Sequence, residues 1–102
     1  MVDHSAIIRK YPNRVPVILL PQGDLTIDKT KFLIPKEYTF GQFVSYIVKH
    51  HVKGSDSKKA IYFFTKQNIL VPVTKTMSEI FDEHRYVDNT LPLNVREENT
   101  FG

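Results

Sequence analysis

The sequence predicts a small α+β domain in which one long helix lies on a mixed sheet of four to five strands. The chain has 102 residues, 41% of them hydrophobic, which is enough for one core and leaves no room for a second domain. β-rich segments stand near both ends of the chain, and a strong helix signal separates them. We therefore expect a single domain over residues 1–102.

The first third of the chain predicts an N-terminal arm and a β-hairpin. Residues 1–13 indicate an arm or short helix, because a pair of isoleucines precedes basic residues. Residues 14–20 are β-rich, and Pro16 removes one ladder donor, so its N–H position should face an edge or the outside. A turn at 21–24 leads to a second strand at 31–35, which its proline ends.

The clearest local signal is a helix over residues 40–52. Thr39 and Gln42 stand at the N-cap and N3 spacing of a capping box. From Phe43 onward, apolar residues recur at helical spacing, as expected of a helix that lies on a sheet. Basic residues fill the last turn, and Gly54 can end the helix in the left-handed conformation.

The second half adds a strand, a short helix and a last strand. Residues 60–65 are apolar throughout and predict a central strand buried on both faces, followed by a short extended piece at 69–71. A second capping box at 76–79 opens a short helix. Residues 90–95 predict the last strand, weakened by Pro92. This order of elements is that of a β-grasp, or ubiquitin-like, domain.

Composition excludes several classes of protein. The chain has no cysteine, which excludes disulfides, cysteine zinc sites and a cysteine nucleophile. Fourteen Lys and Arg against 11 Asp and Glu give a net charge of +3, mildly basic rather than polybasic. No apolar run reaches the ~20 residues that a membrane helix needs. We expect a cytoplasmic protein without cofactor or enzymatic activity.

The histidines and lysines near the middle of the chain have two further interpretations. His50 and His51 are adjacent, so on a helix they point about 100° apart and lack the spacing of a zinc pair. We therefore predict no metal or catalytic site. The local basic cluster could favour anionic lipid or nucleic acid, but no aromatic residues interleave it. A solvated helix end is the better interpretation, and no nucleic-acid partner is expected. The cluster comprises Lys49, His50, His51, Lys53, Lys58 and Lys59.

Several stretches carry a specific resemblance. They are Tyr-Pro-Asn-Arg-Val-Pro-Val-Ile at 11–18, Lys-Phe-Leu-Ile-Pro at 31–35, Thr-Phe-Gly-Gln-Phe at 39–43, Ala-Ile-Tyr-Phe-Phe at 60–64, Thr-Met at 76–77, Glu-His at 83–84 and the final Phe-Gly at 101–102. In order and spacing the chain resembles the autophagy-related protein 8 family of ubiquitin-like modifiers, to which the GABA-receptor-associated protein belongs. The resemblance covers nearly the whole chain from about Ile7.

The resemblance implies conjugation through Gly102. In the family, activating and conjugating enzymes join the terminal glycine to the amino group of phosphatidylethanolamine on autophagosomal membranes, and a cysteine protease processes and deconjugates the modifier. Glycine suits this role because it threads narrow active sites. Residues 96–102 are polar and would form a flexible conjugation tail. We expect the unconjugated form to be monomeric.

The resemblance also implies capture of peptides with an aromatic-x-x-aliphatic core and acidic flanks, added as a strand to the sheet edge. The aromatic pocket would be lined by Ile7, Pro16, Ile18, Lys31 and Leu33. The aliphatic pocket would be lined by Phe32, Ile34, Pro35, Tyr38, Phe43 and Tyr46. Acidic groups would meet Arg14, Lys31 and His50. For any one of these residues, ordinary core packing is the alternative.

The chain departs from the family pattern at several points. About ten residues precede Tyr11, so at most one short helix fits where the family places two. Thr90 takes the place of a phenylalanine at the floor of the aromatic pocket, Pro92 interrupts the last strand, and His50 replaces an arginine. Two other functions remain open: a modifier joined to a protein lysine, as in the twelve-type autophagy modifier, and an unconjugated peptide-binding module.

Overall fold

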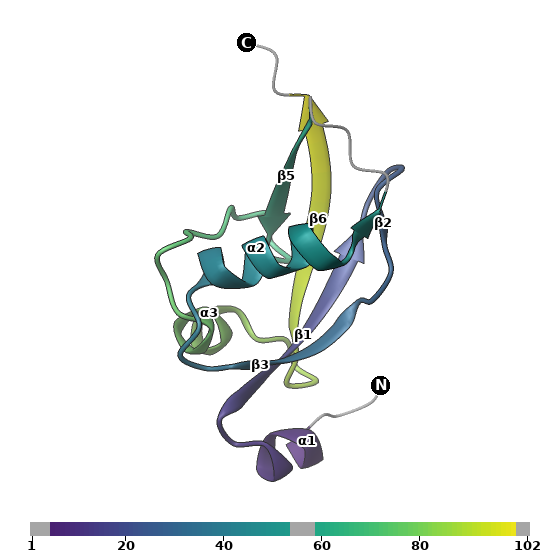
Figure 1. Cartoon of the computed structure of the whole chain (residues 1–102). Coiled ribbons are helices and arrows are strands. Elements are labelled where there is room, and N and C mark those ends of the chain that lie inside the picture. The colour runs from purple at the N-terminus through teal and green to yellow at the C-terminus, as the bar shows by residue number, and fades with distance from the viewer. Residues whose placement is uncertain (1–4, 54–58, 100–102) are drawn as a thin grey trace.

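A computed structural model describes residues 5–53 and 59–99 of the chain (Figure 1). The elements in chain order are α1 (Ser5–Lys10), β1 (Arg14–Pro21), β2 (Thr26–Ile27), β3 (Lys31–Pro35), α2 (Phe40–His50), β4 (Val52–Lys53), β5 (Lys59–Phe64), α3 (Met77–His84) and β6 (Leu91–Asn99). Within these described residues, no helix is long and apolar enough to cross a membrane.

The main sheet has four strands in the order β3-β1-β6-β5. β1 runs antiparallel to β3, which confirms the predicted hairpin, and parallel to β6, while β5 and β6 are antiparallel. β2 and β4 form a separate two-stranded sheet. Figure 1 shows α2 crossing one face of the main sheet and α1 beside the start of β1. The result is a mixed sheet with one long helix, as predicted.

Register explains how two prolines fit into the inner strands. Pro16 lies opposite Leu33 of β3, and the pairing of β1 with β6 starts only at the next residue, Val17. The absence of an N–H on Pro16 therefore removes no hydrogen bond between β1 and β6. Pro92 precedes Asn94, where pairing with β5 begins. The expected interruption at Pro92 is wrong, because β6 is continuous from Leu91 to Asn99.

Helix α2 supplies much of the core. The Thr39–Gln42 capping box is present in both directions, as predicted. The helix ends at His50 with His51 as its C-cap, earlier than predicted, and Gly54 lies outside the described residues. The inner face of α2 presents buried residues to the sheet, and three phenylalanine rings pack edge-on or tilted at centroid distances of 5.7 to 6.2 Å. These rings belong to Phe40, Phe43 and Phe63.

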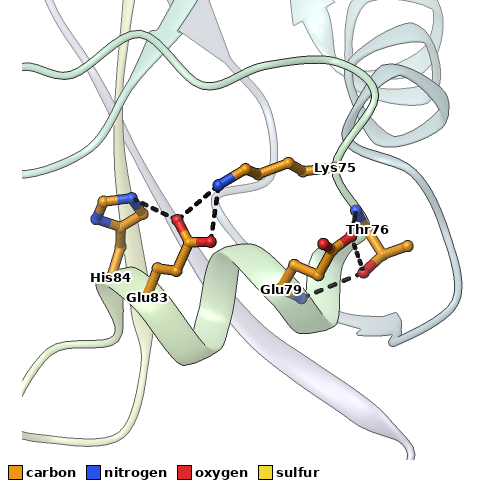
Figure 2. Close-up of polar contacts among 5 residues, drawn as sticks. All are labelled: Lys75, Thr76, Glu79, Glu83 and His84. Atoms are coloured by element: carbon orange, nitrogen blue, oxygen red, sulfur yellow. Dashed lines mark hydrogen bonds and ion pairs between the residues drawn. The ribbon is translucent and has the colours of Figure 1, made fainter.

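The two helix starts are joined to each other. Thr39 and Thr76, the two N-caps, form an isolated β-bridge, and the Phe40 N–H donates to the Lys75 carbonyl at 2.7 Å. The second capping box is also present, with the Thr76 N–H donating to the Glu79 carboxylate (Figure 2). Lys75 pairs with Glu83 on the next turn of α3 at 2.7 Å. The start of α2 is thus anchored from outside the helix.

Two expectations about the second half, a central strand at 60–65 and a flexible tail from residue 96, are corrected by the structure. β5 is an edge strand and not a central one, and of residues 60–64 only Phe63 is buried, the others being half-buried. The short extended piece expected at 69–71 is present as one isolated antiparallel bridge, from Leu70 to Phe64. Residues 96–99, expected in the flexible tail, continue β6, and each pairs with a residue of β5. The apolar run of β5 had suggested burial that the edge position does not provide.

Candidate functional site

Strand β3 forms one open edge of the main sheet. The Leu19 N–H donates to the Thr30 carbonyl at 2.8 Å, so Thr30 and every second residue after it direct their backbone groups toward β1. Lys31 and Leu33 therefore direct their N–H and C=O groups away from the sheet. Among the described strands none pairs with these outward groups, which form a template on which another extended chain can pair.

A pocket of about 500 Å³ lies on one side of this edge. The structure brings to it all five residues that the sequence placed in the aromatic pocket, together with Thr90. Thr90 is only 2% exposed, and its hydroxyl donates to the Asp88 carboxylate at 2.6 Å. The lining consists of Ile7, Pro16, Val17, Ile18, Lys29, Lys31, Phe32, Leu33 and Thr90.

A second pocket of about 360 Å³ lies between β3 and α2. It gathers all six residues that the sequence placed in the aliphatic pocket, from β3, from α2 and from the turn between them. The ring of Phe32 contacts both Phe43 and Tyr46 in edge-on geometry, so the wall of this pocket is a packed aromatic cluster. The lining consists of Arg14, Lys29, Phe32, Leu33, Ile34, Pro35, Tyr38, Phe43 and Tyr46.

The two pockets meet at shared residues and share a basic character. Lys29, Phe32 and Leu33 line both. Among the described residues, the lining of either pocket includes cations but no carboxylate. The Lys29 ammonium stands 5.0 Å above the Phe32 ring, and Arg14 donates to the outward-facing Leu33 carbonyl at 3.2 Å. This arrangement suits an extended ligand with apolar side chains and acidic neighbours.

Sequence reasoning missed Lys29 and His51. Lys29 was missed because it precedes the predicted strand. It stands two residues before Lys31, and residues with this spacing share one face of a strand, so the spacing was the signal that could have identified it. His51 follows α2 and lies against Phe32 at 5.1 Å between ring centroids. His50, in contrast, is exposed, lies 5.1 Å from the Tyr46 ring and lines neither pocket. The structure therefore places two residues at or beside the site, Lys29 and His51, that the sequence analysis did not assign to it.

Gly102, the expected conjugation residue, lies outside the described residues, which end at Asn99. Within the described part of the chain, no group of three or more histidine, aspartate or glutamate side chains could hold a metal ion.

The geometry around β3 is that of a binding groove: two adjacent pockets, an open strand edge between them and cations at the rim.

The whole chain, residues 1–102, matches the family model described as autophagy protein Atg8, ubiquitin like. The chain belongs to the Atg8 family. Autophagy-related protein 8a of Arabidopsis thaliana is 43% identical over 105 residues, covering 100% of this chain and 84% of that protein. Autophagy-related protein 8 of Schizosaccharomyces pombe is 42% identical over 103 residues, covering 98% and 83%. The resemblance inferred from the sequence motifs is confirmed.

Solved structures of Atg8 proteins agree with the fold. Trypanosoma brucei ATG8 superposes with a TM-score of 0.78 at 28% identity, covering 96% of this chain and 84% of that one. Plasmodium falciparum Atg8, solved in complex with a P. falciparum Atg3 peptide, gives a TM-score of 0.73 at 28% identity, covering 89% and 81%. The predicted ubiquitin-like fold is therefore confirmed, and the chain is an Atg8-family autophagy protein.

Proposed function

We propose that this chain is a membrane-conjugated modifier that captures acidic peptides with an aromatic-x-x-aliphatic core at the β3 edge. The observation that carries this proposal is the pair of adjacent pockets that meet at Phe32 and Leu33, with cations and no carboxylate in their lining among the described residues. An aromatic side chain would enter the larger pocket and an aliphatic one the pocket between β3 and α2. The peptide backbone would pair with β3.

The backbone of β3 supports strand addition. Lys31 and Leu33 present outward N–H and C=O groups, and the Leu33 carbonyl already accepts a hydrogen bond from Arg14. An arriving peptide would supply an N–H to this carbonyl and release the guanidinium toward a peptide carboxylate. Arg14 would thus exchange a neutral acceptor for a charged one, which makes the stronger hydrogen bond.

The peptide of a conjugating enzyme is one ligand that the groove fits. P. falciparum Atg8 has been solved in complex with an Atg3 peptide, and that chain shares this fold at 28% identity. We infer that the corresponding conjugating enzyme of this chain presents a segment to the same two pockets. Receptors and adaptors with the same motif would compete for the groove, because both classes of ligand use the β3 edge.

The double variant Lys31→Glu, Leu33→Ala tests the groove. It reverses one rim charge and removes an apolar side chain that both pockets share, so we expect affinity for an acidic aromatic-x-x-aliphatic peptide to fall by about a hundredfold. Isothermal titration calorimetry measures the change. Lys49→Glu is the matched control, because Lys49 is an exposed cation on α2 that lines neither pocket. Undiminished affinity in the double variant would refute the β3 groove.

Conjugation is proposed at Gly102. Activating and conjugating enzymes would pass its carboxyl through thioesters to phosphatidylethanolamine, and a cysteine protease would cleave the resulting amide. The two acyl chains of one phospholipid give stable membrane attachment where a single chain is marginal. We expect Gly102→Ala to abolish lipid conjugation, measured as loss of the lipidated species by mass spectrometry. Normal lipidation of this variant would contradict the assignment.

The mass of the cellular form separates lipid conjugation from the two remaining functions. Addition of one phospholipid supports the modifier proposed here. An isopeptide bond to a protein lysine supports the twelve-type function, and an unmodified chain supports a peptide-binding module without conjugation.

A further inference from the structure

The aliphatic pocket is backed by a polar chain of three residues that join different elements. The His51 ring lies 2.7 Å from the Asp28 carboxylate through Nδ1 and 3.2 Å from the Tyr46 hydroxyl through Nε2. The same ring packs edge-on against Phe32 at 5.1 Å. His51 therefore contacts Phe32 and Tyr46, two of the aromatic side chains in the wall of the pocket, although it does not line the pocket itself.

The protonation of this chain follows from its donors and acceptors. An ionised carboxylate only accepts hydrogen bonds, so Nδ1 of His51 carries a proton that it donates to Asp28. In neutral His51 the other nitrogen, Nε2, accepts, and the Tyr46 hydroxyl donates to it. When His51 is protonated, both nitrogens donate. The Tyr46 hydroxyl then accepts from Nε2, and its own proton turns to another acceptor.

Tyr46 is 44% exposed and lines the aliphatic pocket, so its hydroxyl reaches solvent water in the free protein and would reach a polar group of a bound peptide in the complex. The His51 side chain is 16% exposed and the Asp28 side chain 41% exposed, so solvent reaches their contact from the Asp28 side. The Asp28 N–H also donates to the His51 carbonyl at 3.0 Å, so backbone and side chain together hold the segment that carries Lys29. Protonation of His51 turns its bond with Asp28 into an ion pair and strengthens that hold.

We propose that the Asp28–His51 pair is a proton-responsive positioning device for Tyr46 and Lys29 that makes the groove bind acidic peptides more tightly as the pH falls. This inference rests on the peptide-binding function proposed above and deepens it. Histidine changes charge between about pH 5 and pH 8, a range in which lysine stays charged and peptide carboxylates stay ionised. Of the described titratable and charged residues, Asp28 and Tyr46 bond to the His51 ring, His50 precedes it in the chain, and Lys29 stands over the adjoining Phe32 ring.

The test measures affinity for a synthetic peptide with glutamates before a Trp-x-x-Leu core, by calorimetry from about pH 7.5 to about pH 5.5. We expect the wild-type protein to gain about fivefold in affinity over this range, one hydrogen bond to a charged group being sufficient for such a change. His51→Gln, whose side chain does not titrate, should lose most of the gain, and Asp28→Asn should reduce it. Circular dichroism checks that both variants fold.

Two matched controls separate the other histidines. His84→Gln removes a titrating group on α3 that lines neither pocket and should retain the full gain. His50→Gln leaves His51 in place and should therefore retain the rise in affinity that protonation of His51 produces. A wild-type gain that persists undiminished in His51→Gln overturns the inference and leaves the peptide-binding function intact.

Nuclear magnetic resonance of the free protein tests the coupling between His51 and the pocket wall without any peptide. The ring signals of Tyr46 and Phe32 should shift with the same midpoint as the His51 ring, and this titration should vanish in His51→Gln. If the ring signals of Tyr46 changed with a different pH midpoint from those of His51, the proposed coupling would be refuted. Absence of peptide binding at every pH would refute the proposed function, while the resonance titration would still test the coupling.

Discussion

Phe32 is the residue on which the groove depends. It lines both pockets, contacts Phe43 and Tyr46 edge-on and carries Lys29 above its ring. Its side chain is 7% exposed, so most of its surface serves the core and only its margin meets a ligand. Phe32 therefore packs in the core and also forms part of the pocket wall. A substitution here would change stability and binding together.

Glu79 provides a residue-scale prediction about acid stability. Hydrogen bonds from the backbone and hydroxyl of Thr76 lower the pKa of Glu79 below its ordinary value of 4.5 (Figure 2). Because the folded-state pKa is depressed, its stabilising contribution is present above pH 4.5 and is lost as the pH falls through the folded-state pKa. We expect Glu79→Gln to flatten the loss of stability below pH 4.5, measured by thermal unfolding.

The chain contains its own control for this effect. The capping box of α2 has Gln42 in the position that Glu79 occupies in α3, so its hydrogen bonds do not depend on acid. Gln42→Glu should introduce a new acid dependence at α2. An unchanged pH profile in both variants would contradict the capping explanation.

At the scale of elements, α2 ties the groove to the core. One face of the helix carries Phe43 and Tyr46 to the pocket between β3 and α2, and the inward face buries Ile47 completely. The start of the helix is fixed by its capping box and by the bridge to α3. The pocket therefore depends on a helix whose position is set by packing on the sheet.

Ile47→Ala tests this dependence. The side chain is 0% exposed, so its removal should leave a cavity and lower the free energy of unfolding by about 2–5 kcal/mol. Val48, the next residue, is 39% exposed, and Val48→Ala should change stability by about 0.5 kcal/mol or less. Urea denaturation measures both variants. Equal effects would show that α2 does not pack on the sheet as described.

In the whole molecule, positive charge gathers around the β3 edge of the main sheet. The net charge is only +3, yet Arg14, Lys29 and Lys31 all line the groove. Both Lys29 and Lys31 are exposed, so salt in solution screens their attraction to a peptide. Local placement rather than net charge therefore governs recognition of acidic ligands.

Salt should accordingly weaken binding. Raising the salt concentration from about 0.05 M to about 0.5 M should lower affinity for an acidic-flanked peptide by about fivefold, because the Debye length shortens well below 10 Å. Titration calorimetry at the two concentrations measures the change. A peptide with the same core and neutral flanks is the control and should respond little. An equal response of both peptides would contradict a charged rim.

Local sequence patterns were enough to predict most helices and strands, and the family resemblance was enough to predict most of the groove. The capping boxes at Thr39 and Thr76 predicted both helix starts, because a cap is made by residues three positions apart. The β1–β3 hairpin followed from two apolar runs and a turn. The motif at 11–18 and the stretches that follow it led to the family, and the family resemblance placed eleven residues that the structure gathers around two pockets.

Which strands are central, and which residues lie behind the pockets, depends on the packing of the whole chain. β5 is as apolar as a central strand, but β6 lies between it and β1 and continues to Asn99, so β5 is left at the edge. The Asp28–His51 contact joins residues 23 positions apart, and no local pattern marks it. Short-range signals fix caps and turns, whereas strand order and long-range polar contacts depend on how the whole chain packs.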